Sequence, residues 1–251
     1  MPPHLKAQIN NSLRAKIAPK GTLRVSINVG NPILAKDEGD AKLPTGVSVD
    51  IAQALATLLD LPLSLNVHKA AAHSVSAVTR NESDFGFFAI DPKRGELLEF
   101  TDPYLLIEGA YLVRESSSIQ AQDQVDQSGV NIMVGAGSAY DLYLSRTIKY
   151  AQLLRAPTSP AVVEHFLQHN AEVAAGVKQQ LELSMEGRSG LRLLPGSFMV
   201  IRQAVGVAKS RPPEVHSLFH QFVRYICDSG FVAQALKRHG VQGGRVAAAG
   251  D

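Results

Sequence analysis

Arg94 is the residue of this 251-residue chain whose position most clearly suggests chemistry. The local sequence is Asp91-Pro92-Lys93-Arg94. Asp followed by Pro predicts a helix start, because Asp caps free backbone amides and Pro fits the first helical position. Arg94 would then lie in the first turn, where the helix dipole favours an acid over a cation. A guanidinium beside free amides can bind a carboxylate. An exposed arginine on a surface helix is the alternative interpretation.

A second candidate for anion binding is the turn Gly135-Ala136-Gly137-Ser138, which follows a predicted strand and opens a predicted helix. It fails as a dinucleotide fingerprint, because Tyr140 occupies the third glycine position, and it lacks the Gly-Lys-Ser/Thr of a phosphate loop. A tight turn without a ligand is the alternative.

Other reactive side chains give weaker indications. His165 and His169 have the spacing of metal ligands on a helix, but no third ligand is near in sequence, so exposed or packed histidines are favoured over zinc. The single cysteine, Cys227, excludes an internal disulfide and lies in an apolar-periodic stretch that predicts a buried thiol. No nucleophile elbow is present, and no cofactor is predicted.

The composition, 45% hydrophobic and 19% charged, permits a sizeable core, and a formal net charge of +2 gives no indication of nucleic-acid binding. No apolar run reaches membrane-spanning length. Near the N-terminus, Leu5, Ile9, Leu13 and Ile17 recur every four residues and predict an amphipathic helix. No secretory signal is evident. A helix docked on the domain is favoured over a membrane-surface helix or a transit peptide.

The elements that must position these residues alternate between strands and helices, which predicts an α/β fold with parallel strand pairs. The expected strands are 23–28, 63–67, 84–90, 108–114, 130–134, 153–156, 173–177, 198–201 and 204–208. The expected helices begin near residues 50, 75, 92, 140, 160, 213 and 231. A polar stretch at 115–128 predicts a connection, after which a second α/β unit occupies roughly 129–200.

Together these pieces resemble the type II solute-binding proteins that bind polar amino acids for ABC importers, over most of 20–242. The most specific motif is Arg94 followed by Phe100-Thr101-Asp102-Pro103-Tyr104. The supporting motifs are Gly21–Val25, Gly46–Ala52, Gly135–Ser138 and Ser229–Gly240. The resemblance implies the two-lobe periplasmic-binding-protein type II fold, in which each lobe is a mostly parallel sheet flanked by helices and two hinge strands join the lobes. The implied parts are a helical extension at 1–19, lobe 1 at 20–112 plus 204–242, lobe 2 at 113–203, and a flexible tail at 243–251.

The same resemblance implies a ligand site. Arg94 would pair with the ligand's α-carboxylate, backbone around Ala89 would support that group, and the turn at Gly137 and Ser138 would face it from lobe 2. The ligand-binding residues expected on this basis are Arg94, Ala89, Asn28, Asn31, Phe88, Gly137, Ser138, Tyr140, Thr158 and Lys178.

The departures from the family pattern concern the ligand's amino group. The acid that binds an α-ammonium should follow the strand 173–177, where this chain has Lys178-Gln179-Gln180. The first-strand acid of some members is Asn28 here, and the stacking aromatic is replaced within Ala70–Ala72. Because Lys178 would repel an ammonium, we expect a carboxylate ligand that is not an ordinary α-amino acid, or one with a second anionic group. An alignment shifted by a few residues, or a solvent-facing Lys178, is the alternative.

The expected function is therefore a solute-binding protein for transport or sensing. Its expected partners are a small carboxylate ligand and an ABC importer permease, and a monomer is expected. A lyase similar to cyclohexadienyl dehydratases is the alternative, with Glu172 or Asp141 as the candidate acid; a structural role is a further one. Without a signal peptide the chain is expected to stay in the cytoplasm, whereas the resemblance implies an extracytoplasmic place; a Met1 that is not the native start would remove this conflict.

Overall fold

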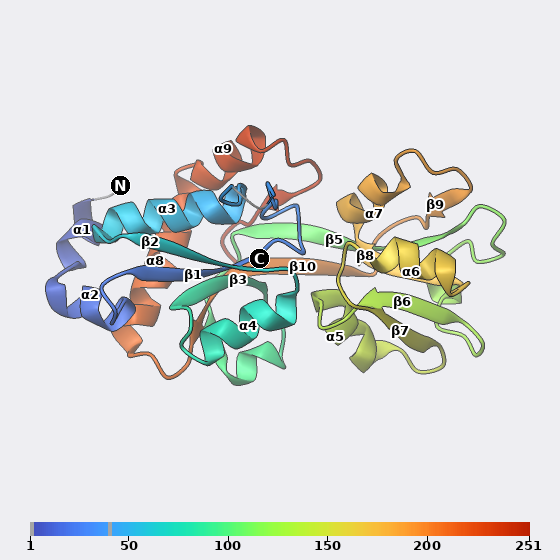
Figure 1. Ribbon diagram of the computed structural model, residues 1–251, viewed down its shortest axis with the longest axis horizontal. Coiled ribbons are helices and arrows are strands. Elements are labelled where there is room, and N and C mark those ends of the chain that lie inside the picture. The colour runs from blue at the N-terminus through green and yellow to red at the C-terminus, as the bar shows by residue number, and fades with distance from the viewer. Residues whose placement is uncertain (1–2, 40–41) are drawn as a thin grey trace. The chain divides into compact units, whose positions relative to one another are not determined.

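A computed structural model describes residues 3–39 and 42–251, and the chain forms two compact units (Figure 1). Unit 1 consists of residues 1–106 and 202–251, and unit 2 consists of residues 107–201. Unit 1 is discontinuous in sequence, because unit 2 lies between residues 106 and 202 of the chain. Two long strands, β5 (Leu105–Arg114) and β10 (Met199–Ala208), contain residues of both units.

Unit 1 is an α/β unit that contains three parallel strands and several helices. Its strands are β1 (Leu23–Asn28), β2 (Leu63–His68), β3 (Phe85–Ala89), β4 (Leu98–Phe100) and β11 (Arg245–Val246). Its helices are α1 (Pro3–Gln8), α2 (Asn11–Ile17), α3 (Val47–Leu59), α4 (Ala71–Thr79), the 3₁₀ turn η1 (Arg94–Glu96), α8 (Pro213–Asp228) and α9 (Phe231–Arg238). Strands β2, β1 and β3 pair in parallel in that order, and β10 pairs antiparallel to β3.

The core of unit 1 follows from the apolar faces of these elements. Helix α8 buries one stripe that includes Phe219 and Phe222, and Phe85 meets the Phe219 ring edge-on, with 5.0 Å between ring centroids. Every residue of β3 is buried, as expected for a central strand covered on both faces.

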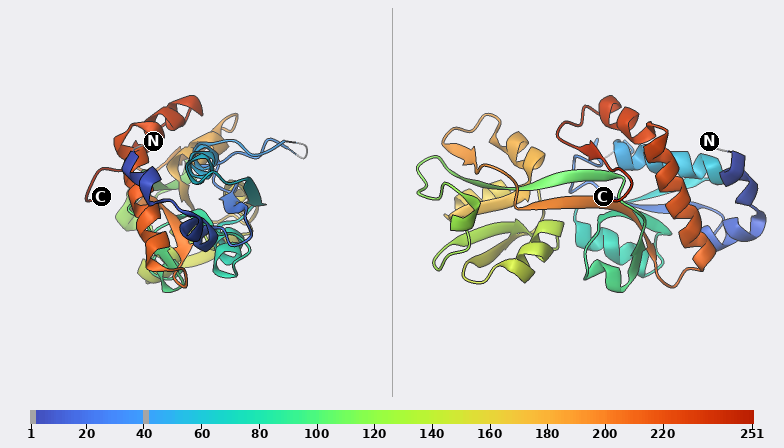
Figure 2. Two further views of the ribbon diagram at one scale, coloured as in Figure 1. Left: turned by 90° about the vertical axis from the view of Figure 1, so that its left-hand side faces the viewer. Right: turned by 180° about the vertical axis from the view of Figure 1, so that it is seen from behind.

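The N-terminal helices belong to this unit, because α1 and α2 pack on α8 (Figure 2). Leu5, Leu13 and Ile17 of the apolar series are buried, whereas Ile9 is half-buried in the connection between the two helices. This confirms the docked-helix interpretation. No helix of the described chain is both long and apolar enough to span a bilayer.

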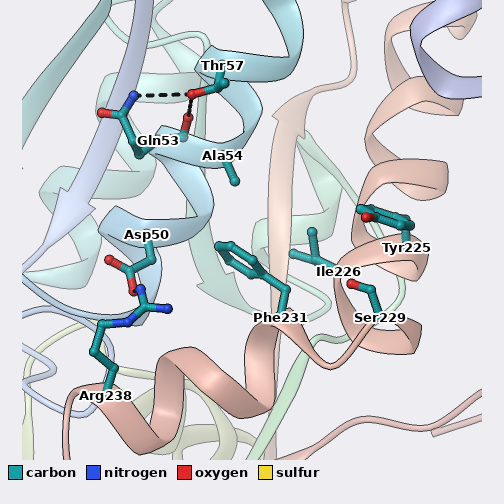
Figure 3. A pocket seen from close by; sticks show the side chains of 9 residues that line it. All are labelled: Asp50, Gln53, Ala54, Thr57, Tyr225, Ile226, Ser229, Phe231 and Arg238. Carbon is teal, nitrogen blue, oxygen red and sulfur yellow. Dashed lines mark hydrogen bonds and ion pairs between the residues drawn. The ribbon is translucent and has the colours of Figure 1, made fainter. Parts of the chain in front are cut away.

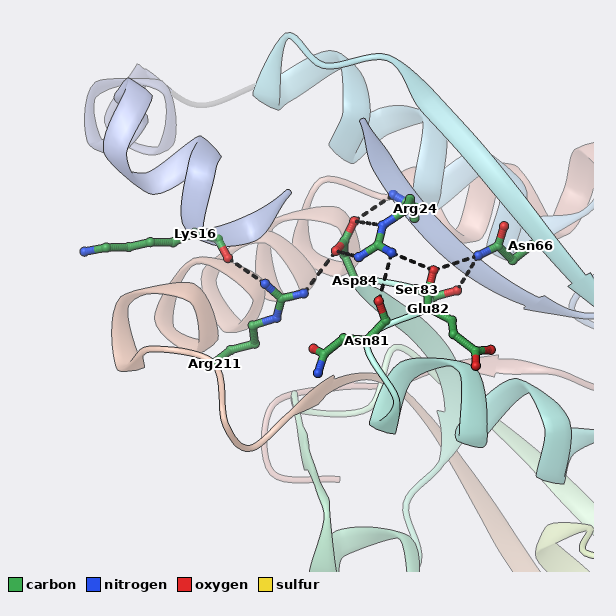
Figure 4. A network of polar contacts seen from close by, with 8 residues as sticks. All are labelled: Lys16, Arg24, Asn66, Asn81, Glu82, Ser83, Asp84 and Arg211. Atoms are coloured by element: carbon green, nitrogen blue, oxygen red, sulfur yellow. Dashed lines mark hydrogen bonds and ion pairs between the residues drawn. The ribbon is translucent and has the colours of Figure 1, made fainter. Parts of the chain in front are cut away.

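A buried charge network fixes the same region (Figure 4). The Asp84 carboxylate, with no exposed side-chain surface, pairs with Arg24 at 2.6 Å and with Arg211 at 3.0 Å. Arg211 also donates to the carbonyl oxygen of Lys16, 3.1 Å away. The network therefore links β1, the start of β3, the segment before α8 and the end of α2.

Unit 2 repeats the α/β pattern. Its elements are η2 (Gln122–Gln124), β6 (Asn131–Gly135), α5 (Ala139–Thr147), β7 (Gln152–Ala156), α6 (Val162–Gln168), β8 (Val173–Val177), α7 (Lys178–Met185) and β9 (Leu191–Leu193). Strand β6 pairs in parallel with β7 and β8, and β5 pairs antiparallel to β8. Phe166, Val163 and Ala174 are among the buried residues that join α6 to this sheet.

Several elements differ from the sequence-based expectation. The predicted helix after Asp91 is only the 3₁₀ turn η1, because Leu98–Phe100 pair with β10 as β4 and leave no length for a helix. The two strands predicted at 198–201 and 204–208 are the single strand β10, and α7 was not predicted. The segment expected to be a flexible tail, 243–251, contains β11, which pairs with β5.

Candidate functional site

In unit 1, the carboxyl ends of three parallel strands carry the predicted polar residues. The register pairs Asn28 with His68, and β3 ends at Ala89 beside β1. Ligands of open α/β sheets bind outside the carboxyl ends of the strands, because loops and helix starts meet there. Asn28, Asn31, Ala89 and Arg94 all come from this edge.

Arg94 is the central cation of the edge. Its side chain is buried, with 7% of the residue exposed, and its Nη1 donates to the carbonyl oxygen of Ala89 at 3.2 Å. Burial lowers the pKa of Arg94 to about 10, and the nearby Asp91 carboxylate acts in the opposite direction. The guanidinium is therefore charged at neutral pH although most of its hydration is lost, a condition that favours pairing with an anion.

The cap at Asp91 is present although the expected helix is not. Asp91 Oδ1 accepts a hydrogen bond from the Lys93 amide at 2.9 Å, and the Gly95 amide donates to the Asp91 carbonyl at 2.8 Å. One 3₁₀ turn has little macrodipole, so the argument from an unfavourable first turn does not hold here. The case for Arg94 rests on its burial and its place at the strand ends.

The loop after β1 is held by its own asparagines. Asn28 Oδ1 accepts from the Gly30 amide at 3.0 Å, and Asn31 Oδ1 accepts from the Ile33 amide at 3.3 Å. Gly30 passes close to the next loop, since a Cβ there would lie 2.4 Å from the Lys69 carbonyl oxygen. The amide nitrogens of both asparagine side chains remain the groups that could donate to a ligand.

Phe88 serves the core rather than the edge. Its ring is buried and packs with Val78 and Leu98 over the glycines Gly86 and Gly206. A Cβ on Gly86 would lie 2.4 Å from the Phe88 ring, so these glycines make room for it. Only the backbone of Phe88 is left to contribute at the strand end.

The most specific sequence motif, Phe100–Tyr104, also has a structural role. Thr101 exchanges backbone and side-chain hydrogen bonds with Val205 of β10, at 3.0 and 3.1 Å. Tyr104 is fully buried and its ring meets Phe87 edge-on, with 5.9 Å between centroids. The motif thus fastens the chain after Arg94 to β10 and does not itself add a binding group.

Unit 2 has an equivalent edge. The carboxyl ends of β6, β7 and β8 lie at Gly135, Ala156 and Val177, and the register pairs Gly135 with Ala156. The predicted residues Gly137, Ser138, Thr158 and Lys178 follow directly after these ends. Thr158 is half-buried, and its carbonyl oxygen accepts from the Ala161 amide at 3.2 Å as α6 begins.

The glycine turn at this edge already holds an anion, and that anion is part of the chain. The Gly137 amide donates to Asp141 Oδ2 at 2.8 Å, while Ser138 caps α5 by accepting from the Asp141 amide at 3.0 Å. Asp141 also accepts from Arg155 Nε at 3.1 Å and from Ser145 Oγ at 3.2 Å. A ligand that used the Gly137 amide would have to compete with this carboxylate.

Tyr140 lies behind the turn rather than over it. The residue is buried, its hydroxyl donates to Ser159 Oγ at 2.8 Å, and burial raises its pKa. A Cβ on Gly135 would lie 2.7 Å from the Tyr140 hydroxyl oxygen. The side chain therefore supports the start of α6 and is not placed for direct contact with a ligand at the edge.

Lys178 is the first residue of α7 and has an ionic partner that sequence reasoning missed. Its Nζ lies 3.4 Å from Oε2 of Glu108, a residue of β5. Gly109 pairs with Val177, so the antiparallel register brings the two side chains together across 70 residues of sequence. The Lys178 side chain is partly exposed, at 38%, and its ammonium group is paired with Glu108. Only the strand register could have revealed Glu108.

The two acids considered for lyase chemistry, Asp141 and Glu172, both accept hydrogen bonds from other groups of the chain. Asp141 is engaged as described above. Glu172 precedes β8, at the opposite end of the strand from Lys178, and its Oε2 accepts from the amide and side chain of Asn131 at 2.8 and 3.0 Å. Glu172 therefore lies away from the carboxyl edge, whereas Asp141 lies at that edge but is already hydrogen-bonded to Gly137 and Arg155.

Other clusters carry no comparable site. His165 and His169 stack on each other, with 5.4 Å between ring centroids, and no group of metal-ligating side chains suited to an ion occurs in 3–39 and 42–251. Cys227 is partly buried, and burial raises the pKa of its thiol to about 11. A pocket of about 410 Å³ lies between α3, α8 and α9, where the Asp50–Arg238 pair borders Phe231 (Figure 3); none of the predicted ligand residues lines it.

Comparisons with known proteins identify the family and the fold of the chain. The family described as bacterial extracellular solute-binding proteins, family 3, matches residues 23–242, whereas no curated protein matches the sequence. Among solved structures, the solute receptor for L-cysteine of Neisseria gonorrhoeae is 19% identical and has a TM-score of 0.76, with 90% of this chain and 92% of that chain covered.

Two further solved structures are similar. A histidine kinase sensor domain that resembles periplasmic binding proteins is 16% identical, with a TM-score of 0.76 over 90% of this chain and 98% of that chain. An ancestral amino-acid-binding protein, described as a precursor of cyclohexadienyl dehydratase, is 15% identical, with a TM-score of 0.75 over 90% and 97% of the two chains. At these identities the likeness shows the fold alone, and it confirms the predicted two-lobe type II fold.

Proposed function

Because the chain belongs to the bacterial extracellular solute-binding proteins, family 3, we propose that it binds a small carboxylate-bearing solute by closing its two lobes on it. The observation that carries the proposal is Arg94, a buried guanidinium at the carboxyl edge of the unit 1 sheet. A guanidinium can bind a ligand carboxylate through two parallel N–H···O hydrogen bonds, and such a charged pair is stronger in a desolvated site. The carbonyl of Ala89 orients the guanidinium for this contact.

The ligand we propose is not an ordinary α-amino acid. The position after β8, which the family resemblance associates with an acid for the ammonium, holds Lys178, and β8 ends where the sequence placed it. An ammonium brought near Lys178 would meet a like charge, which costs affinity. An organic acid, or a ligand with a second anionic group, avoids this cost.

The biological role we propose is that of a receptor, with transport and sensing both open to this fold. Its partner in transport would be an ABC importer permease, and its working place would be outside the cytoplasmic membrane. The similarity to a kinase sensor domain supports sensing as the other form of the same binding function.

A lyase is the second candidate, supported by the similarity to the ancestral precursor of a cyclohexadienyl dehydratase. The carboxylates of Asp141 and Glu172 already accept hydrogen bonds from backbone amides, which favours a binding protein over a lyase. Incubation with prephenate, followed by a search for phenylpyruvate, distinguishes the two functions. We expect no product.

Isothermal titration calorimetry tests the binding proposal. Glutarate and 2-oxoglutarate would be compared with L-glutamate and L-alanine, using the native chain, Arg94→Gln and the exposed neighbour Lys93→Gln as the matched control. We expect Arg94→Gln to lose at least about 30-fold in affinity, because a desolvated charge pair is broken. Lys93→Gln should bind as the native chain does. Equal binding by Arg94→Gln would overturn the anchor, and tight binding of L-alanine would overturn the ligand class.

A further inference from the structure

A pocket of about 330 Å³ in unit 1 lies between the end of β10 and the first turns of α8. Four of the described residues that line it are basic or carry an imidazole, namely Lys209, Arg211, His216 and His220, and one, Glu99, is acidic. None of these five residues belongs to the expected ligand site. A concentration of cations around a hollow favours the binding of an anion.

Arg211 places this pocket at the amino ends of the parallel strands of unit 1. It donates to the Asp84 carboxylate at 3.0 Å, and Asp84 immediately precedes β3 (Figure 4). Arg94 and Ala89, in contrast, lie at the carboxyl end of β3. The pocket and the Arg94 site are therefore at opposite ends of one strand, and each can be tested without the other.

The charges around the pocket do not cancel. The single Asp84 carboxylate is shared by Arg24 and Arg211, so these three groups carry a net positive charge. Lys209 is exposed, and its ammonium makes no ion pair with another residue of the described chain. Glu99, whose side chain is 46% exposed, is the acid that offsets part of this charge. The positive charges of this group thus exceed the negative ones before a histidine takes up a proton.

His216 has one ring nitrogen that the fold does not use. The residue is 7% exposed, and its Nε2 lies 3.0 Å from the carbonyl oxygen of Arg211. Because a carbonyl oxygen only accepts, we assign the hydrogen of the neutral ring to Nε2. Nδ1 makes no hydrogen bond with any residue of 3–39 and 42–251. An unpaired nitrogen on a nearly buried side chain indicates a partner from outside the chain.

We propose that this pocket binds a phosphate group, either as free phosphate or as the phosphate end of a small monoester. The phosphate oxygens accept hydrogen bonds from the Lys209 ammonium and from the N–H of His220. The Ser217 hydroxyl donates as well, because its Oγ already accepts from Gln221 at 3.1 Å. A P–OH group donates to Nδ1 of His216.

Glu99 limits the affinity of the pocket for an anion. Its Oε2 lies 3.7 Å from His216 Nε2, so it repels a phosphate bound beside that ring. Removal of this negative charge should strengthen phosphate binding, whereas removal of a cation should weaken it. The volume of the pocket leaves room beyond the phosphate for a short organic substituent.

Calorimetry with inorganic phosphate and with glycerol 3-phosphate, at neutral pH and low ionic strength, tests the proposal. Lys209→Gln and His220→Gln should each weaken binding about three- to tenfold, and Glu99→Gln should strengthen it about threefold. Lys237→Gln removes an exposed lysine of α9 in the same unit and should bind as the native chain does. Tighter binding of glycerol 3-phosphate identifies a monoester as the ligand class, and tighter binding of inorganic phosphate identifies the free ion.

Two further measurements separate this site from the Arg94 site. Arg94→Gln should bind phosphate as the native chain does, and Lys209→Gln should leave glutarate binding unchanged. The side chains replaced in the pocket variants are exposed or half-buried, so these variants should fold, which urea unfolding checks.

Three outcomes would overturn the phosphate site. The first is the absence of phosphate binding to the native chain. The second is equal phosphate affinity in Lys209→Gln, His220→Gln and the native chain. The third is loss of phosphate binding in Arg94→Gln, which would place the phosphate at the carboxyl edge. A native chain that binds phosphate but no carboxylate would overturn the proposed function and leave this site standing.

Discussion

The Arg94 guanidinium donates to the carbonyl oxygen of Ala89, the last residue of β3, across 3.2 Å. This contact uses one donor of the side chain and fixes its direction at the end of the central strand. The nearby Asp91 carboxylate acts on the same cation electrostatically. The Ala89 carbonyl and the Asp91 carboxylate, which both act on Arg94, belong to one short segment, residues 89–94.

Asp91→Asn should separate stability from binding. The amide oxygen can still accept from Lys93, but the negative charge that offsets buried Arg94 is lost. We expect the free energy of unfolding of the ligand-free chain to fall by about 1–3 kcal/mol. Carboxylate affinity should rise, because the ligand then replaces the missing charge. Denaturant unfolding and calorimetry check both; weaker binding would show that Asp91 positions Arg94 rather than competes for it.

Asp84→Asn should be among the most destabilising polar substitutions in unit 1. Its carboxylate is fully buried between Arg24 and Arg211, and removal of its charge leaves two cations without their shared partner. The expected loss is about 3–5 kcal/mol in urea unfolding. Glu214→Gln, which breaks the exposed Lys16–Glu214 pair, is the matched control and should change stability little. Similar losses for both variants would contradict the role given to burial.

Ile17→Ala tests whether the N-terminal helices are part of the fold. Ile17 is 1% exposed and its helix packs on α8, so truncation leaves a cavity. We expect a loss of about 2–5 kcal/mol of unfolding free energy. Lys20→Ala, at an exposed position of the same segment, should have little effect. A stable Ile17→Ala variant would mean that this segment is dispensable.

Asp141→Asn should lower the stability of the fold and should not affect any catalytic activity. The charge that organises Gly137, Ser145 and Arg155 is removed, while one oxygen remains to accept from Gly137. The predicted cost is about 1–3 kcal/mol, measured by thermal and urea unfolding. If Asp141 were a general acid, the same variant would instead abolish turnover of prephenate at unchanged stability.

His68 should make unit 1 sensitive to acid. Burial lowers the pKa of His68, repulsion from His73 adds to this, and Glu82 opposes it. Because the folded pKa lies below the unfolded value of 6.5, the unfolded state binds protons first as pH falls. Stability is therefore full above pH 6.5 and declines as pH falls through the folded pKa. His68→Gln should flatten this decline between pH 7 and 5, and His73→Gln should flatten it less. An unchanged pH profile in His68→Gln would refute the assignment.

The sequence by itself determined the alternation of strands and helices, because apolar periodicity and turn residues act locally. It placed β1 and β8 at their observed ends, and so fixed which residues follow each strand end. Arg94 and Lys178 could be named on that basis. It could not show that Arg94 lies in a 3₁₀ turn, because Leu98–Phe100 join β10, which comes about a hundred residues later.

Tertiary structure decided what these residues meet. The pairing of β5 with β8 brought Glu108 to Lys178, and packing closed Phe88 and Tyr140 into their cores. The tertiary structure also places the Asp141 carboxylate where it accepts a hydrogen bond from the Gly137 amide. Burial, which no local pattern measures, lowers the Arg94 pKa to about 10. The physical reason is common to all of these: strand register and desolvation depend on segments remote in sequence, whereas helix and strand preferences do not.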